Sequence, residues 1–215
     1  MSRALRKHNF QVLSIDHKGP KGVPILRLNI VKASERKNLT SLLRTASLHY
    51  VHFAPPCGTA SAAREIQPGP PPLRSVEFPM GLANLAPLQQ QRLDAANLLY
   101  EYTCEAVEIL DSRNIDWSIE NPASSLMWVT RPFRRLQRRR KKLFAFSFHT
   151  CMFLAPRKKD TALWCSFPQL RLHIAFHVIT AMVTSNGGAF MAPKGLLLQQ
   201  LWSVPTTTPW LLAGH

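Results

Sequence analysis

The chain has 215 residues, of which 46% are hydrophobic, and this is enough to bury one sizeable core. Four scattered cysteines without a CxxC pair exclude a disulfide scaffold or zinc ribbon and favour a reducing, intracellular setting, and no apolar run reaches the roughly 18 residues of a membrane span. A formal charge of +15 predicts a polyanionic partner, with nucleic acid first, unless the charge only solubilises an apolar chain.

Strand and helix signals alternate along the first half of the chain. The predicted elements are strands at Phe10–Asp16 and Val23–Ile30, a helix at Lys32–Ser47 and a short buried strand at Tyr50–Ala54. Prolines then predict a long loop from Ile66 to Leu85, of the kind that is usually a functional lid or disordered.

A second helix and strand complete the pattern. Leu88–Arg113 has helical spacing, Asn114 is a stop signal, and Ile115–Pro122 is typical of a strand. This order predicts a Rossmann-like α/β fold, with a mostly parallel sheet flanked by helices. We expect one core over residues 1–170, and a less defined C-terminal segment, 171–215, that can pack on it.

Two reactive side chains follow neighbouring strands. Cys57 comes after one predicted strand and Glu120 ends another, and ligands of parallel sheets bind at the carboxyl ends of the strands. A thiolate is a nucleophile, and a partly buried Glu can hold a proton near neutral pH. We therefore expect a shared site for covalent attack. The alternatives are a buried, apolar role for Cys57 and a helix-capping role for Glu120.

Three motifs carry a family resemblance. "HFAPPCGTAS", "WSIENP" and "CMFLAPRKKDT" resemble, in order and spacing, motifs of the DNA (cytosine-5)-methyltransferases, and most closely a divergent set found in mobile elements. The resemblance spans Phe10 to Ser166. It implies a methyltransferase fold that binds S-adenosylmethionine, and the chain begins just after the position of the family's glycine-rich first motif.

The resemblance implies a role for each matched residue. Cys57 would attack C6 of a cytosine flipped out of its stack, and Glu120 would protonate or hydrogen-bond N3, so that C5 accepts the methyl group. Asn121 would brace the loop that carries Cys57, and Arg157 would contact the base or its phosphates. The residues implied on the cofactor side are Asp16 for the ribose, Asn29 beside the adenine, and Pro55, which also shapes the loop.

Departures from the family pattern keep other functions open. Gly19 and Gly22 stand too late to replace the missing glycine-rich turn, whose glycines let the backbone approach a cofactor. The main alternative is therefore a catalytically inactive, nucleic-acid-binding relic. A cysteine hydrolase is a third interpretation, with His52 as the nearest histidine on the preceding strand.

A basic segment, Arg131–Lys142, has eight basic residues in twelve. Phosphate contact is the functional interpretation, and a solvated helix face or a nuclear-targeting run is the alternative. The residues expected to contact nucleic acid are Lys159, Arg134, Arg135, Arg138, Arg139 and Arg140. DNA is the expected partner, with RNA also admissible, in the nucleus or nucleoid.

The C-terminal region has weaker signals. His173 and His177 could share a helix face and bind a metal with Cys165, but no fourth ligand accompanies them, so we predict no metal site. Met191–Trp202 faintly resembles the closing helix of the methyltransferases, although its spacing suits any packing helix.

Overall fold

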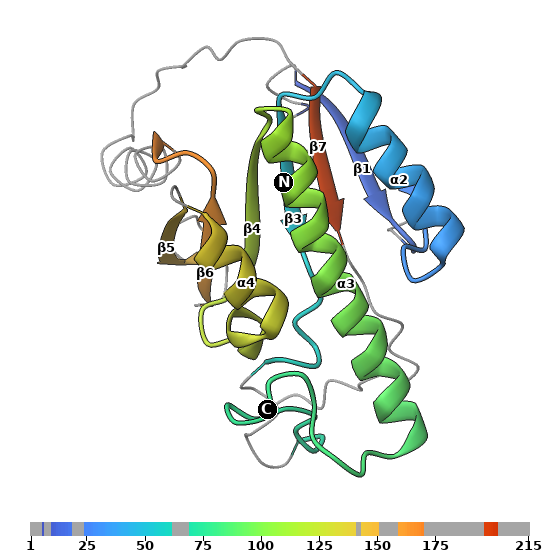
Figure 1. Ribbon diagram of the computed structural model, residues 1–215, viewed down its shortest axis with the longest axis vertical. Helices are drawn as coiled ribbons and strands as arrows, with labels where there is room; N and C mark the ends of the chain where they lie inside the picture. The colour runs from blue at the N-terminus through green and yellow to red at the C-terminus, as the bar shows by residue number, and fades with distance from the viewer. Residues whose placement is uncertain are drawn as a thin grey trace, which may run out of the picture.

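The computed structural model describes residues 6, 10–18, 24–61, 69–140, 143–150, 159–169 and 196–201. Within these residues the strands form one sheet, in the order β2-β1-β7-β3-β4-β6-β5 (Figure 1). The strands are β1 (Gln11–Asp16), β2 (Leu26–Arg27), β3 (Tyr50–Ala54), β4 (Asp116–Pro122), β5 (Phe144–His149), β6 (Asp160–Cys165) and β7 (Leu196–Leu201). The helices are α2 (Ala33–Thr45), α3 (Pro87–Ser112), the short 3-10 helix η2 (Leu126–Val129) and α4 (Arg131–Arg139).

The sheet is parallel over most of its width. β2, β1, β7, β3 and β4 pair in parallel, whereas β6 is antiparallel to both of its neighbours, β4 and β5. The expected mixed α/β class with parallel strands is confirmed. The predicted strand at Val23–Ile30 is wrong in length, because only Leu26–Arg27 pairs with β1 and a turn follows, in which Lys32 N donates to Asn29 O.

Helix α3 forms where its spacing predicts it. Pro87 occupies the first turn, where a missing N–H costs nothing, and the backbone N–H of Ala86 donates to Gln89 Oε1 at 3.1 Å. The helix ends at Ser112, and Asn114 just beyond it has a φ of 53°, a left-handed conformation that asparagine tolerates. No helix in the described part of the chain is long and apolar enough to span a membrane.

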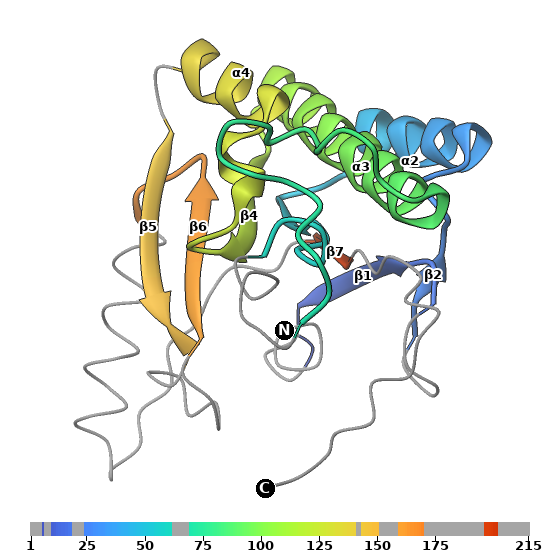
Figure 2. The same ribbon diagram turned by 90° about the horizontal axis from the view of Figure 1, so that it is seen from below.

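The three α-helices of the described residues all cover one face of the sheet (Figure 2). Apolar side chains from the sheet and the helices form one core between them. Fully or almost fully buried members include Leu39, Leu43, Val51, Phe53, Ala106, Leu110, Trp117, Ile119 and Phe133.

The C-terminal segment contributes the middle strand of the five parallel strands. The expected helix over Met191–Trp202 is wrong, because Leu196–Leu201 is β7, paired in parallel with β1 and β3. A short apolar run does not distinguish a strand from a helix, and a central parallel strand is typically apolar throughout. The predicted boundary at residue 170 therefore does not separate this segment from the core, and β7 closes the edges that β1 and β3 would otherwise expose.

Candidate functional site at the carboxyl edge of the sheet

The strand order reverses on either side of β7. On one side of β7 the strands follow in the order β1 and β2, and on the other side in the order β3 and β4. Open α/β sheets bind ligands at such a reversal of strand order, at the carboxyl ends of the strands. Phe53 pairs with Ile119, so that Ala54 and Glu120 follow at the same level. The structure therefore places the Cys57 turn just after β3, and Glu120 near the carboxyl end of the adjacent parallel strand β4.

The turn that carries Cys57 is held by buried hydrogen bonds. Asn121 Nδ2 donates to the Pro55 carbonyl oxygen at 2.8 Å, and the Tyr100 hydroxyl donates to the Pro56 carbonyl oxygen at 2.6 Å. Both donors are almost fully buried, whereas Cys57 is partly exposed. The bracing contact that the resemblance implies for Asn121 is thus present, and the thiol lies on a fixed turn.

Arg74 is a further support of this turn, and nothing in the sequence signals it. Its side chain is 2% exposed, and its guanidinium donates to Thr59 Oγ1 at 3.1 Å, to the Pro79 carbonyl oxygen at 2.6 Å and to Asn97 Oδ1 at 2.7 Å. It also lies 5.2 Å from the ring centroid of Tyr100. Burial lowers the pKa of Arg74. The guanidinium connects the loop before α3 to the residues just after Cys57.

Glu120 lies between two basic side chains. Its Oε2 is 3.7 Å from His52 Nε2, and its Oε1 is 3.8 Å from Lys159 Nζ. The neighbouring His52 imidazole is the main cause that lowers the pKa of Glu120, Lys159 adds to it, and burial opposes it. Glu120 is therefore a carboxylate at neutral pH, and the expectation that it holds a proton there is wrong.

This shift gives a pH prediction. A lowered pKa stabilises the folded state above the unfolded value of 4.5, and the stabilisation is lost as the pH falls through the lower folded value. We expect the difference in unfolding free energy between the wild type and Glu120→Gln to shrink between pH 5 and pH 3, measured by urea denaturation. A constant difference across this range would contradict the assignment of Glu120 as a stabilised carboxylate.

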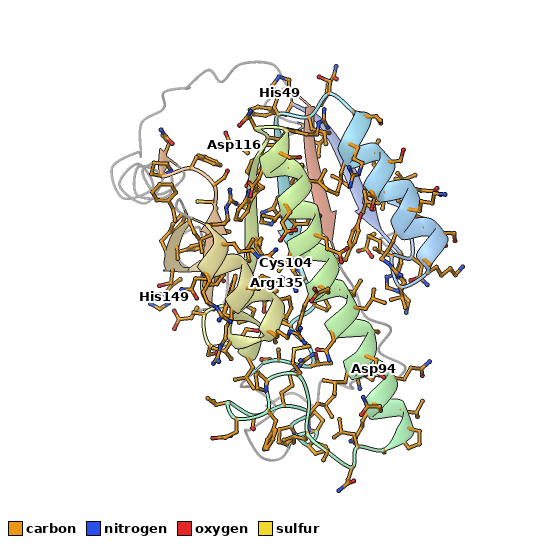
Figure 3. The ribbon with its side chains drawn as sticks, viewed as in Figure 1. His49, Asp94, Cys104, Asp116, Arg135 and His149 are labelled. Atoms are coloured by element: carbon orange, nitrogen blue, oxygen red, sulfur yellow. The ribbon has the colours of Figure 1, made fainter. Side chains whose placement is uncertain are left out.

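The other described cysteines are unsuited to attack. Cys104 is 1% exposed on α3, where it faces Arg135 of α4 (Figure 3), and burial raises its pKa. Cys165 is fully buried in β6, and burial raises its pKa as well. Among the cysteines that the structure describes, Cys57 is the one with an accessible thiol.

The residues expected on the cofactor side are already engaged. The Asp16 side chain is 10% exposed, and its Oδ1 accepts from the Lys18 N–H at 3.2 Å and lies 3.3 Å from His17 Nδ1. Asn29 Oδ1 accepts from the Val31 N–H at 3.2 Å. In the sequence, β7 is followed by no glycine before Gly214. No glycine-rich turn lies among the described residues, and the polar atoms of Asp16 and Asn29 already have partners within the protein.

The basic segment forms α4, and half of its arginines have acidic partners on α3. Arg135 pairs with Glu101, Arg139 with Glu108 at 3.2 Å, and Arg140 with Asp111. Arg140 also lies 4.5 Å from the Trp117 ring centroid. Arg139 is exposed despite its partner, and Arg131, Arg134 and Arg138 are exposed without a carboxylate partner among the described residues. The predicted phosphate contacts therefore stay a prediction for Arg131, Arg134 and Arg138, which we call the exposed side of α4.

Several expected residues are placed differently from their predictions or lie outside the described residues. Lys159 contacts Glu120. Both ring nitrogens of His52 are engaged by β4, at Ser118 and Glu120, so His52 does not support the hydrolase interpretation. Arg157, His173 and His177 lie outside the described residues.

Comparisons with protein-family models, curated proteins and solved structures return no match.

Proposed function

We propose that this protein binds nucleic acid and engages a single cytosine at the edge formed by Cys57 and Glu120, as a DNA (cytosine-5)-methyltransferase-like protein. The observation that carries the proposal is the hydrogen bond from Asn121 to Pro55, which joins the end of β4 to the Cys57 turn. It links the elements bearing the thiol and the carboxylate, and the partly exposed Cys57 remains open to a ligand.

The proposed chemistry uses the two groups on one ring. Cys57 Sγ adds as a thiolate to C6 of cytosine, a bond forms between sulfur and carbon, and the electron pair of the C5–C6 double bond moves toward C5 and N3. The Glu120 carboxylate accepts a hydrogen bond from the exocyclic amine of cytosine, a contact typical of acidic side chains. The base must leave its stack, because these atoms are unreachable inside a duplex.

Methyl transfer is not part of the proposed reaction of the described residues. S-adenosylmethionine would supply the methyl group in the family that the chain resembles, but Asp16 and Asn29 are engaged, and no glycine-rich turn lies among the described residues. Isothermal titration with S-adenosylmethionine is expected to show no binding, and measurable binding would restore the full enzyme interpretation.

The cytosine site is tested by covalent capture. An oligonucleotide with one 5-azacytosine, whose ring nitrogen makes C6 more electrophilic, is expected to form a complex that survives denaturing electrophoresis. Peptide mapping by mass spectrometry should place the base on Cys57 and not on the buried Cys104 or Cys165. Absence of a complex with single-stranded, mismatched and paired substrates would overturn the proposal.

Nucleic-acid binding without chemistry is the second candidate, and the exposed side of α4 favours it. We expect the triple variant R131Q/R134Q/R138Q to weaken oligonucleotide binding and to reduce the slope of log affinity against log salt by about 2 to 3. The matched triple R135Q/R139Q/R140Q removes arginines that carboxylates on α3 already neutralise, so its slope should change less. Fluorescence anisotropy from 50 to 200 mM salt measures both. Equal slopes for the two triples would discard the exposed arginines as phosphate ligands.

A further inference from the structure

A buried chain of polar groups crosses from β3 to β4 and ends at Glu120. The Tyr50 hydroxyl contacts Ser118 Oγ, Ser118 Oγ is 2.8 Å from His52 Nδ1, and His52 Nε2 is 3.7 Å from Glu120 Oε2. His52 is 1% exposed and Ser118 is fully buried. Strand pairing sets this geometry, because His52 lies directly opposite Ser118 in the parallel ladder.

The chain leaves His52 with its Nε2 directed at the carboxylate. Ser118 can donate to Nδ1 or accept from it, since a hydroxyl does both, so the imidazole is satisfied in either protonation state. Nε2 has the Glu120 carboxylate as its partner in both states. His52 is therefore built to carry a proton beside Glu120 and to release it without losing its contact to Ser118.

The proposed addition needs such a proton. When the thiolate adds to C6, negative charge develops on the ring, and a proton at N3 neutralises it. Glu120 is a carboxylate, because the His52 contact lowers its pKa, and it has no proton of its own to give at neutral pH. A neighbouring acid must supply one.

We propose that His52 is a positioning residue that holds this proton and passes it through Glu120 to the cytosine, an inference that rests on the proposed function. In the balanced step, imidazolium Nε2–H gives its proton to Glu120 Oε2, and Glu120 gives a proton to N3 as the bond from Cys57 Sγ to C6 forms. His52 ends neutral, the adduct is neutral, and reversal returns the proton to His52. No oxidant or further reactant is required.

The charged and titratable groups around His52 are compatible with this role. In the described residues, Glu120 is the acidic group at its ring, and Lys159, just before β6, contacts the other carboxylate oxygen. Tyr50 shares the partner Ser118, and burial raises its pKa, so its hydroxyl stays protonated. Cys165 lies opposite Ser118 in β6, and its pKa is also raised by burial.

The first test is the rate of adduct formation at pH 7 in His52→Gln, with 5-azacytosine oligonucleotide as the probe. The Gln side chain cannot give up a proton to Glu120, so the rate should be roughly a hundredfold lower than in the wild type. His49→Gln is the matched control, since His49 lies at the amino end of β3 (Figure 3), and it should keep the wild-type rate. An unchanged rate in His52→Gln would overturn the inference.

A second measurement separates this inference from the proposed function. Carboxyl NMR titration of Glu120 in the free protein should show a higher pKa in His52→Gln than in the wild type, since His52 is the main cause of the lowered value. An unchanged Glu120 titration refutes the pairing even where adducts form. If the wild type forms no adduct, the proposed function fails and the proton transfer fails with it, whereas the titration still shows whether His52 and Glu120 share a proton.

Discussion

Cys57→Ser is expected to reduce the rate of covalent capture of 5-azacytosine by at least about a thousandfold. The two side chains have nearly the same size, but a serine hydroxyl is almost never ionised near neutral pH, whereas a thiol is ionised in part. Because Cys57 is partly exposed and its turn is held through backbone carbonyls, the free energy of unfolding should stay within about 0.5 kcal/mol of the wild type.

Cys104→Ser is the matched control for this experiment. Cys104 is 1% exposed among apolar neighbours, so the serine hydroxyl is buried there and should destabilise the fold by about 1 to 3 kcal/mol while capture continues. Gel analysis of capture and urea denaturation measure both variants. A Cys57→Ser protein that captures the base at the wild-type rate would place the nucleophile elsewhere.

Arg74→Leu is expected to lower the free energy of unfolding by about 3 kcal/mol. The guanidinium donates to the buried Thr59 and to the partly buried Pro79 and Asn97. Its loss leaves these acceptors without their donor, at a cost of roughly 1 to 3 kcal/mol for each group that water cannot reach. The contact with the Tyr100 ring is lost as well. Leucine restores only part of the apolar packing of the long side chain.

The same substitution should impair the site. Thr59 lies just after Cys57, and the Tyr100 hydroxyl donates to the Pro56 carbonyl oxygen. In the variant, Thr59 loses its hydrogen bond from Arg74, and the Tyr100 ring loses its contact with the guanidinium. Capture of 5-azacytosine should slow in Arg74→Leu under conditions where the protein is still folded. Arg134→Leu is the matched control, because Arg134 is exposed on α4, and it should change the free energy of unfolding by less than about 0.5 kcal/mol. Thermal denaturation with equal stability losses in the two variants would contradict a structural role for Arg74.

The site combines a turn held by buried hydrogen bonds with a carboxylate that lies between two basic side chains. Asn121, Tyr100 and Arg74 fix the position of the thiol through buried contacts, while the environment of Glu120 depends on His52 and Lys159. A nucleophile that adds to a flat ring needs both, because the attack requires alignment and the developing charge requires a proton. The part of the chain that the structure describes supplies these features without a glycine-rich cofactor turn.

Local sequence patterns determined most of the elements. The predicted helices at Lys32–Ser47 and Leu88–Arg113 correspond to α2 and α3 with small differences at their ends, and the strands around Tyr50–Ala54 and Ile115–Pro122 correspond to β3 and β4. These patterns depend on the spacing of apolar residues within one segment, which the sequence contains in full. The expectation that Cys57 and Glu120 share an edge also followed from this order, because consecutive parallel strands end on the same side.

Tertiary structure alone decided the contacts between distant segments. The placement of β7 between β1 and β3, the pairing of arginines on α4 with carboxylates on α3, and the meeting of Arg74 with Thr59 join residues that no local pattern relates. The same holds for His52 and Glu120, whose contact lowers the pKa of the carboxyl group and reverses the protonation state expected from its sequence context. Electrostatic and hydrogen-bond energies depend on distance in space and on burial, so they become readable only when the chain is folded.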